Sequence, residues 1–184
     1  DSLCYSGTFG SGRKYPDLSP SAFLVDQCAR IYFTGWGGLG NFNGRSSGRT
    51  TDLPIPDSVA AEKNYSLGAD FYLAVFAENM DTILYGSYFG GDTTTEHVDG
   101  GTSRYNKAGI VYQSVCAGCG AGSSDFPETK GVVSEKNKAA TGNLCNNALF
   151  KVDFDAPVLY ALFSIPEAAC FETNIEPINR SINA

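Results

Sequence analysis

Two cysteines with the spacing of a metal clip stand in the middle of the chain. Cys116 and Cys119 form a C-x-x-C pair inside the glycine-rich stretch VYQSVCAGCGAGSSDFPETKG. The spacing suits a zinc site, for which Cys145 and His97 would supply the third and fourth ligands. The same spacing occurs in redox proteins, where a helix N-terminus stabilises the first thiolate. Because this pair follows a strand-like segment and lies among glycines, we do not expect redox catalysis.

A structural disulfide is the interpretation that the rest of the sequence favours. The chain holds six cysteines, an even number that is typical of an oxidising, exported setting. We expect one cysteine of the pair to bond Cys145 and so to tie the intervening loop to a strand that begins near Asn147. Cys4 and Cys28 would form a second bridge across neighbouring strands. The disulfide candidates are Cys4, Cys28, Cys116, Cys119, Cys145 and Cys170.

The segment GGDTTTEHVDGG holds the only histidine of the chain and three acidic residues. A Ser-His-Asp or Cys-His mechanism would have to use this histidine, His97. No G-x-S-x-G motif is present, and we expect a solvated loop histidine. Asp92, Glu96 and Asp99 are weak calcium candidates, since they do not match the EF-hand spacing and fit an ordinary acidic loop. We therefore expect no cofactor and no enzymatic activity.

Three aromatic side chains lie in predicted loops, where they could contact a ligand: Trp36, Phe42 and Phe126. Such rings can stack on sugars, so a carbohydrate-binding unit is one alternative function. A carbohydrate-hydrolysing unit is another, because the distance between carboxylates that decides this chemistry is not shown by the sequence. The competing interpretation of Trp36 is a ring that packs inside the fold.

The composition limits the kinds of partner. The 184 residues carry a net charge of −7 without a run of basic residues, which argues against nucleic-acid binding. The longest apolar runs, such as residues 158–163, are too short to span a bilayer. No signal-peptide pattern is present, so we expect a mature chain or a piece of a longer one. A content of 21 glycines and 12% aromatic residues favours an all-β fold with many turns.

The chain repeats itself with an offset of about 80 residues. LCYSGTFGS (3–11) matches ILYGSYFGG (83–91), and ARIYFTGWGG (29–38) matches AGIVYQSVCAG (108–118). Each copy then has a Gly/Ser-rich loop that ends in Asp-apolar-Pro, at 52–54 and at 125–127. ADFYLAVF (69–76) matches NALFKVDF (147–154), and TILYGSYF has a degraded counterpart in PVLYALFS (157–164). Four matches in one order indicate a true repeat.

The repeated segments read as strands, because they are short, rich in β-branched and aromatic residues, and bounded by Gly, Pro, Asn or Asp. In each copy a further short strand, SAFLVD (21–26) or the more polar GTSRYN (101–106), would come first and be joined by a hairpin to the next strand. Each copy is thus a four-stranded antiparallel unit, the pattern of a β-propeller blade. We expect the last strand of a preceding blade at 1–11, one blade at 12–91, a second at 92–166, and a linker with a further strand at 167–184. Two blades cannot close a ring, so they would belong to a larger propeller.

The motifs ILYGSYFGG, GIVYQSV, SSDFPETKG and NALFKVDF together resemble the bacterial β-propeller repeat of large cell-surface proteins. The segment with Cys116 and Cys119 is similar to copies in very large secreted proteins of Bacteroidota, which carry immunoglobulin-like PKD modules and gliding-motility sorting regions linked to type IX secretion. The tail at 170–184 resembles the first strand of a PKD module. The second copy departs from the family pattern in the degraded segment ALFSIPEA (161–168) and in the polar segment GTSRYN (101–106), which is consistent with a terminal blade.

The resemblance implies a non-catalytic scaffold or adhesion module, extracellular or at the cell surface. Its partners would be other domains of the same large chain, and surface glycans or proteins, with no nucleic acid and no membrane span. Two alternatives stay open: a carbohydrate-binding or carbohydrate-hydrolysing propeller, and a zinc-stabilised module built on the C-x-x-C cysteines.

Overall fold

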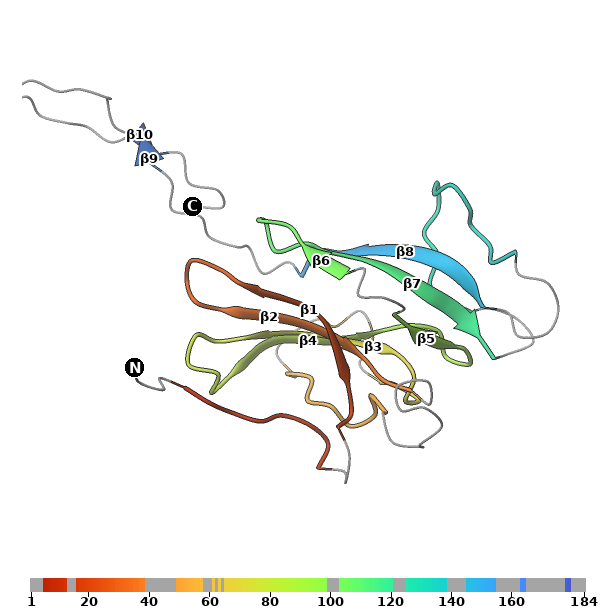
Figure 1. Cartoon of the computed structure of the whole chain (residues 1–184), viewed down its shortest axis with the longest axis horizontal. Helices are drawn as coiled ribbons and strands as arrows, with labels where there is room; N and C mark the ends of the chain where they lie inside the picture. Colours follow the sequence, from red (N-terminus) through yellow and green to blue (C-terminus); the bar gives the residue numbers. More distant parts are fainter. Residues whose placement is uncertain are drawn as a thin grey trace, which may run out of the picture.

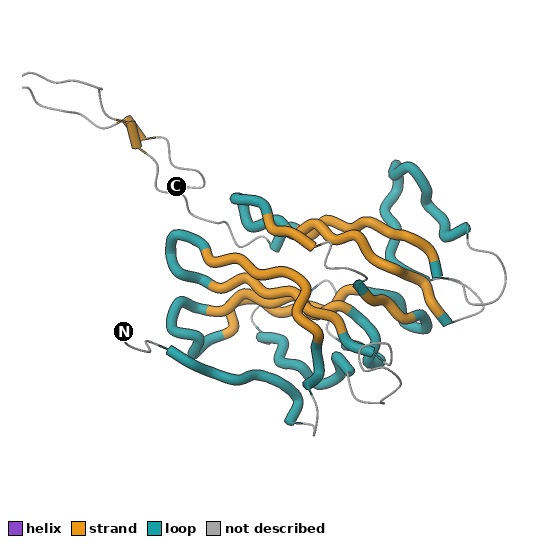
Figure 2. The backbone as a smooth tube through the Cα atoms, in the orientation of Figure 1, coloured by secondary structure: helices purple, strands orange, loops and turns teal. Residues whose placement is uncertain are grey.

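The main body of the described structure consists of two four-stranded antiparallel β-sheets, which we describe from a computed structural model (Figure 1). The structure describes residues 5–12, 16–38, 49–57, 61, 63, 65–98, 103–120, 125–138 and 145–154, and the backbone of 163–164 and 178–179. No helix occurs in these ranges, and irregular connections join the strands (Figure 2). The expectation of an all-β chain with four-stranded antiparallel units is confirmed. Neither sheet closes on itself.

The first sheet is a simple meander in which neighbours in sequence are neighbours in space. Its strands are β1 (Ser19–Val25), β2 (Ile31–Trp36), β3 (Phe71–Phe76) and β4 (Ile83–Phe89). They lie within two residues of the segments that the sequence predicts. Their β-branched and aromatic side chains suit a pleated surface, and short turns connect β1 to β2 and β3 to β4.

The second sheet is built around one long strand. Its strands are β5 (Thr95–His97), β6 (Ser103–Tyr105), β7 (Val111–Cys119) and β8 (Asn146–Val152). The strands β5 and β6 pair with the two halves of β7 along one side, and β8 pairs along the other side. The segment 92–101, which we expected to be a connection, therefore contributes a strand.

Two sequence expectations about the ends of the units are wrong in the described residues. The fourth strand of the second unit was expected at 157–164, but β9 (Phe163–Ser164) pairs with β10 (Ile178–Asn179) in a separate two-stranded sheet. Residues 5–12 form no strand. The fourth strand of the second sheet is instead β5, which pairs with β7 on the side opposite β8.

The repeat is visible in atomic detail at the turn that leads into the central strand of each unit. Asp26 Oδ1 accepts hydrogen bonds from the backbone N–H groups of Cys28 and Arg30, both at 2.9 Å. Asn106 Oδ1 accepts them from Ala108 and Ile110, at 2.9 and 3.0 Å. These side-chain acceptors fix the same turn 80 residues apart. The internal duplication therefore extends from the sequence to the structure.

A second pair of equivalent features lies near the end of the two matching segments LCYSGTFGS and ILYGSYFGG. Gly10 and Gly90, 80 positions apart, have nearly the same φ, 156° and 155°. A carboxylate lies against each glycine: an added Cβ would come within 2.8 Å of Asp17 Oδ2 at Gly10 and within 2.6 Å of Glu96 Oε2 at Gly90. Only glycine leaves room for this contact.

The main core lies between the two sheets and is rich in aromatic rings. Phe154 packs edge-to-face against Tyr32 and Tyr85, with ring centroids 5.9 and 5.2 Å apart. Phe150 packs in the same way against Phe71 at 5.0 Å. Burial of each such ring contributes about 1.5–3 kcal/mol to folding. The core thus fixes the second sheet on one face of the first.

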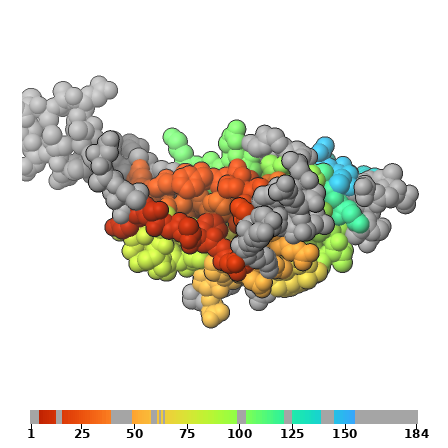
Figure 3. Space-filling model, turned by 60° about the horizontal axis from the view of Figure 1, so that its bottom comes forward, coloured from red at the N-terminus to blue at the C-terminus, as the bar shows by residue number. Residues whose placement is uncertain are grey.

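Irregular segments cover the opposite face of the first sheet. The ring of Phe9 packs on Phe33 and Phe76, with centroids 5.2 and 5.1 Å apart. The hydroxyl groups of Tyr72 and Tyr88 donate to backbone carbonyls of the segment 49–57, at 2.6 and 3.0 Å. Figure 3 shows the red N-terminal segment and the orange segment 49–57 on the face turned to the viewer. As a result, β3 is buried along its whole length.

Candidate functional site

A β-bulge in β7 brings the two cysteines of the C-x-x-C pair to one face of the second sheet. His97 pairs with Cys116 and Thr95 with Cys119, so two residues of β7 lie opposite one residue of β5. Residues three apart in a regular strand point to opposite faces. The extra residue of the bulge, at which Gly118 has a φ of 70°, returns Cys119 to the face of Cys116.

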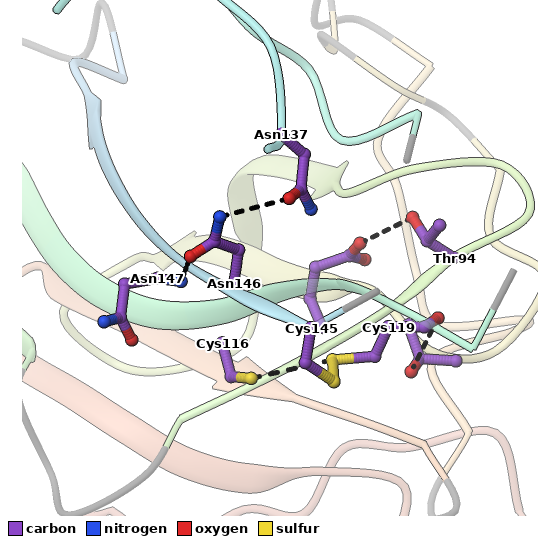
Figure 4. Close-up of a disulfide and its surroundings, with 9 residues drawn as sticks. Thr94, Cys116, Cys119, Asn137, Cys145, Asn146 and Asn147 are labelled. Carbon is purple, nitrogen blue, oxygen red and sulfur yellow. Dashed lines mark hydrogen bonds between the residues drawn. A yellow bond between two sulfur atoms is a disulfide. The ribbon is translucent and has the colours of Figure 1, made fainter. Parts of the chain in front are cut away.

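The three cysteines of this region meet at the bulge (Figure 4). Cys119 forms a disulfide with Cys145, which confirms the prediction that one member of the pair bonds Cys145. Cys145 stands directly before β8, and Asn146 pairs with Ala117 beside the bulge. Cys116 Sγ is not part of the disulfide and lies 3.6 Å from Cys119 Sγ.

His97 completes this group, in contrast to the solvated loop histidine that we expected. It lies in β5 and is half-buried. A ring nitrogen of His97 and the sulfur atoms of Cys116 and Cys119 all lie within 4.8 Å of one another. Its ring also packs near the indole of Trp36, with centroids 5.8 Å apart. The zinc alternative thus has three of its four candidate ligands in one cluster, and the fourth, Cys145, is bonded to one of them.

The other face of β5 carries a buried carboxyl group rather than a loop acid. Glu96 is 1% exposed, and burial raises the pKa of its carboxyl to about 7, with Asp70 adding to the rise. Thr94 Oγ1 lies 2.9 Å from Glu96 Oε1 and 2.6 Å from Asp125 Oδ1. Thr94 has a single hydroxyl proton, so it can donate to only one of these two carboxyl groups at a time. The calcium role for Glu96 does not fit this arrangement.

Lys63 supplies the positive charge next to these acids. Its Nζ lies 3.2 Å from Asp70 Oδ1 and 3.1 Å from Asp92 Oδ1. It also donates to the carbonyl oxygens of Gly90 and Gly91, at 3.2 and 3.1 Å. Burial raises the pKa of Asp70 despite the nearby ammonium, while Lys63 itself keeps a raised pKa because the two carboxylates outweigh its own burial. The ammonium group of Lys63 therefore pairs with both carboxylates. Asp99, the third calcium candidate, lies outside the described residues.

The Asp-Phe-Pro turn anchors the connection between the two sheets. Asp125 Oδ2 accepts hydrogen bonds from the backbone N–H groups of Asp92 and Thr93, at 2.8 and 2.7 Å, and from Thr93 Oγ1 at 2.9 Å. The next residue, Phe126, is 9% exposed and packs edge-to-face on Phe89 at 5.5 Å. The motif thus links the end of β4 to the start of β5 in two ways: through the carboxylate of Asp125 at the surface and through the ring of Phe126 in the core.

The loop aromatics do not form one surface in the described part of the chain. Phe126 is a core residue, and Trp36 is half-buried against the same hydrophobic cluster between the sheets. This supports the packing interpretation of Trp36. Phe42 lies outside the described residues, as do Cys4 and Cys170. Cys28 is exposed and has no disulfide in the described structure, so the predicted bridge to Cys4 is not seen.

Sequence reasoning missed the Lys63–Asp70 pair. The two residues are close in sequence, but their contacts to residues 90–92 join segments that no short motif links. The one available signal was an aspartate at the entry to the most hydrophobic segment, ADFYLAVF. An aspartate directly next to such an apolar strand is expected to be buried with it, and a buried carboxylate needs a partner of opposite charge or a hydrogen-bond donor.

Comparisons with protein-family models, curated proteins and solved structures found no match to this chain. In the described residues, no helix is long and apolar enough to cross a membrane. The chemistry of this region is therefore inferred from the geometry of its own side chains. The cysteine sulfur atoms can form disulfides, and together with the imidazole they can bind a soft metal ion. Glu96, Lys63 and Asp125, in contrast, make contacts that hold segments of the chain together.

Proposed function

We propose that this chain is a scaffold or adhesion segment of an exported bacterial surface protein, in which four-stranded β units repeat as blades of a larger propeller. The observation that carries the proposal is the pair of equivalent turns at Asp26 and Asn106, with the equivalent glycines at Gly10 and Gly90. Repetition of whole units at this level of detail suits a protein that stacks similar modules. The disulfide between Cys119 and Cys145 fits an oxidising compartment.

The charged side chains support a mechanical rather than a catalytic role. The ammonium group of Lys63 ties together the start of β3 and the end of β4. The carboxylate of Asp125 binds the backbone between β4 and β5. These contacts fix the connections that would otherwise be the weakest parts of a repeated β structure. Other domains of the same chain are the first partners of such a segment, with surface glycans or proteins beyond them.

The outer face of the second sheet is the surface on which a further unit would pack. Tyr112 pairs with Lys151, and Ser114 with Leu149, so these four side chains share one face. Leu149 is 81% exposed and Tyr112 is 42% exposed. The corresponding outer face of the first sheet is covered. A neighbouring blade would bury the exposed leucine and tyrosine in the same way.

Cysteine labelling on intact cells tests the proposal. In a Cys28→Ser background, Leu149→Cys and Val133→Cys are introduced into the natural protein, and a membrane-impermeant maleimide is applied before peptide mapping. Val133 is fully exposed, at 108%, in a surface segment and serves as the matched control. We expect fast labelling at position 133 and at least tenfold slower labelling at position 149. Failure to label position 133 on intact cells would refute export, and equal rates would refute packing of a further unit on this face.

A further inference from the structure

Three cysteines and the only histidine of the chain converge at the bulge of β7. We propose that His97, Cys116, Cys119 and Cys145 form a four-ligand site for a zinc ion when the cysteines are reduced. The inference is independent of the scaffold function. In this view the region has two states: the one seen in the structure, with a disulfide between two of these cysteines, and a reduced state that binds zinc.

The distances between ligand atoms match those of a tetrahedral zinc site. A Zn–S bond is about 2.3 Å long, so two sulfur ligands of a tetrahedron lie about 3.8 Å apart. Cys116 Sγ and Cys119 Sγ are 3.6 Å apart, and a nitrogen of His97 lies within 4.8 Å of both. Cys145 Sγ is bonded to Cys119 Sγ but is not among the atoms that lie within 4.8 Å of one another, so its side chain must turn toward the ion after reduction. The Cα atoms of Cys119 and Cys145 are only 4.2 Å apart, which keeps this fourth ligand next to the other three.

The elements that carry the ligands hold this arrangement. Cys116 and His97 are directly paired across β7 and β5, and the bulge fixes Cys119 on their side. Pairing of Asn146 with Ala117 holds Cys145 at the same level of the sheet. The indole of Trp36 lies beside the imidazole of His97 and limits the access of water to it. A site on paired strands is more rigid than one on loops.

The ligand set selects the class of metal. Three thiolates and one imidazole favour a soft or borderline ion such as Zn²⁺ over Ca²⁺ or Mg²⁺, which require oxygen ligands. Four protein ligands leave no open position, so the ion would be structural rather than catalytic. It would bind β5, β7 and the start of β8 to one another, as the disulfide binds β7 to β8.

The two states are related by a balanced redox step. A low-molecular-weight thiol transfers two electrons to the Cys119–Cys145 bond, which breaks and takes up two protons, while two molecules of the thiol form their own disulfide. Zinc then displaces the protons of the three thiols. In the reverse direction the disulfide of the low-molecular-weight thiol is the oxidant: it takes two electrons and two protons from Cys119 and Cys145, their bond re-forms and the ion is released.

The test uses the whole chain, reduced with a phosphine under anaerobic conditions and titrated with ZnCl₂ alone. We expect one zinc per chain by elemental analysis after gel filtration in the presence of a weak chelator. The variants Cys116→Ser and His97→Asn should lose the bound zinc, while Cys28→Ser, the control for an exposed thiol, should keep it. Cys116→Ser retains both cysteines of the disulfide, so its oxidised form checks that the variant folds.

Alkylation of the wild-type chain gives a second readout that needs no variant. Zinc should protect Cys116, Cys119 and Cys145 from iodoacetamide at least tenfold, without changing the rate at Cys28. Cobalt in place of zinc should give the absorption bands of a tetrahedral thiolate complex. The proposal is overturned if the reduced chain binds no zinc, if both ligand variants bind as much as the wild type, or if protection is absent or equal at all cysteines.

Discussion

Removal of the carboxylate of Asp125 should weaken the joint between the two sheets. This carboxylate accepts four hydrogen bonds from residues 92–94. A hydrogen bond to a charged group contributes about 1.5–3 kcal/mol when buried. Because Asp125 is exposed and water competes for the same donors, we expect about 0.5–1 kcal/mol for each bond. The substitution Asp125→Ala should therefore lower the free energy of unfolding by about 2–4 kcal/mol, and Asp125→Asn by about half as much.

The effect should depend on pH in a defined direction. Burial alone would raise the pKa of Asp125, but hydrogen bonds from Thr94 and Thr93 outweigh it and lower the pKa below its ordinary value. A carboxylate with a lowered pKa in the folded state contributes stability above the pKa of the unfolded state, and this contribution disappears as the pH falls through the folded-state pKa. The deficit of Asp125→Asn relative to the wild type should thus be largest near neutral pH and shrink below about pH 4.

Urea unfolding followed by circular dichroism, at pH 7 and at pH 3, measures both quantities. Glu128→Gln, which removes a charge from an exposed residue three positions away, is the control and should change the midpoint little. The reasoning fails if Asp125→Ala unfolds at the same urea concentration as the wild type at pH 7. It also fails if the deficit of Asp125→Asn is equal at the two pH values.

Four further single substitutions test other contacts of the structure. Cys145→Ser opens a loop of 26 residues and should lower the free energy of unfolding by about 3–4 kcal/mol in chelator-treated samples; reductant should affect the wild type but not the variant. Lys63→Met leaves the carboxylate of Asp70 buried without its ammonium partner and should cost about 3 kcal/mol; adding Asp70→Asn should recover part of the loss, and strict additivity in the double-mutant cycle would contradict the pairing. Asn106→Ala should cost about 1 kcal/mol, and Asp26→Ala should cost more because it also removes the ion pair with Arg30; no measurable effect in one of them would show that the two turns are not equivalent.

The strands of the first sheet could be predicted because each short segment by itself has the composition and the boundaries of a β-strand. IYFTGW and FYLAVF are short apolar and aromatic runs, bounded by Gly, Asp or Asn, and β2 and β3 coincide with them. The turn before each central strand was also predictable, since Asp26 and Asn106 occupy matching places in the repeat. In these segments, local preference and tertiary packing favour the same structure.

The second sheet was harder to predict because its pairing depends on contacts distant in sequence. The strand β5 has three residues, Thr-Glu-His, with no apolar pattern, and only its pairing with β7 makes it a strand. The same pairing buries Glu96 and half-buries His97. The bulge that unites Cys116 and Cys119 leaves no unambiguous signal either, since glycines are equally common in loops. The C-x-x-C spacing identified the right residues, and only the register showed how they meet.

The contact between Trp36 and His97 gives the molecule an intrinsic optical reporter. The chain has one tryptophan, and its indole lies 5.8 Å from the imidazole that borders the sulfur cluster. Disulfides and open-shell metal ions such as Co²⁺ quench indole emission, whereas the closed-shell Zn²⁺ does not. The fluorescence of an unlabelled sample should therefore distinguish the oxidised, reduced and cobalt-loaded forms, so that conversion between them can be followed in real time.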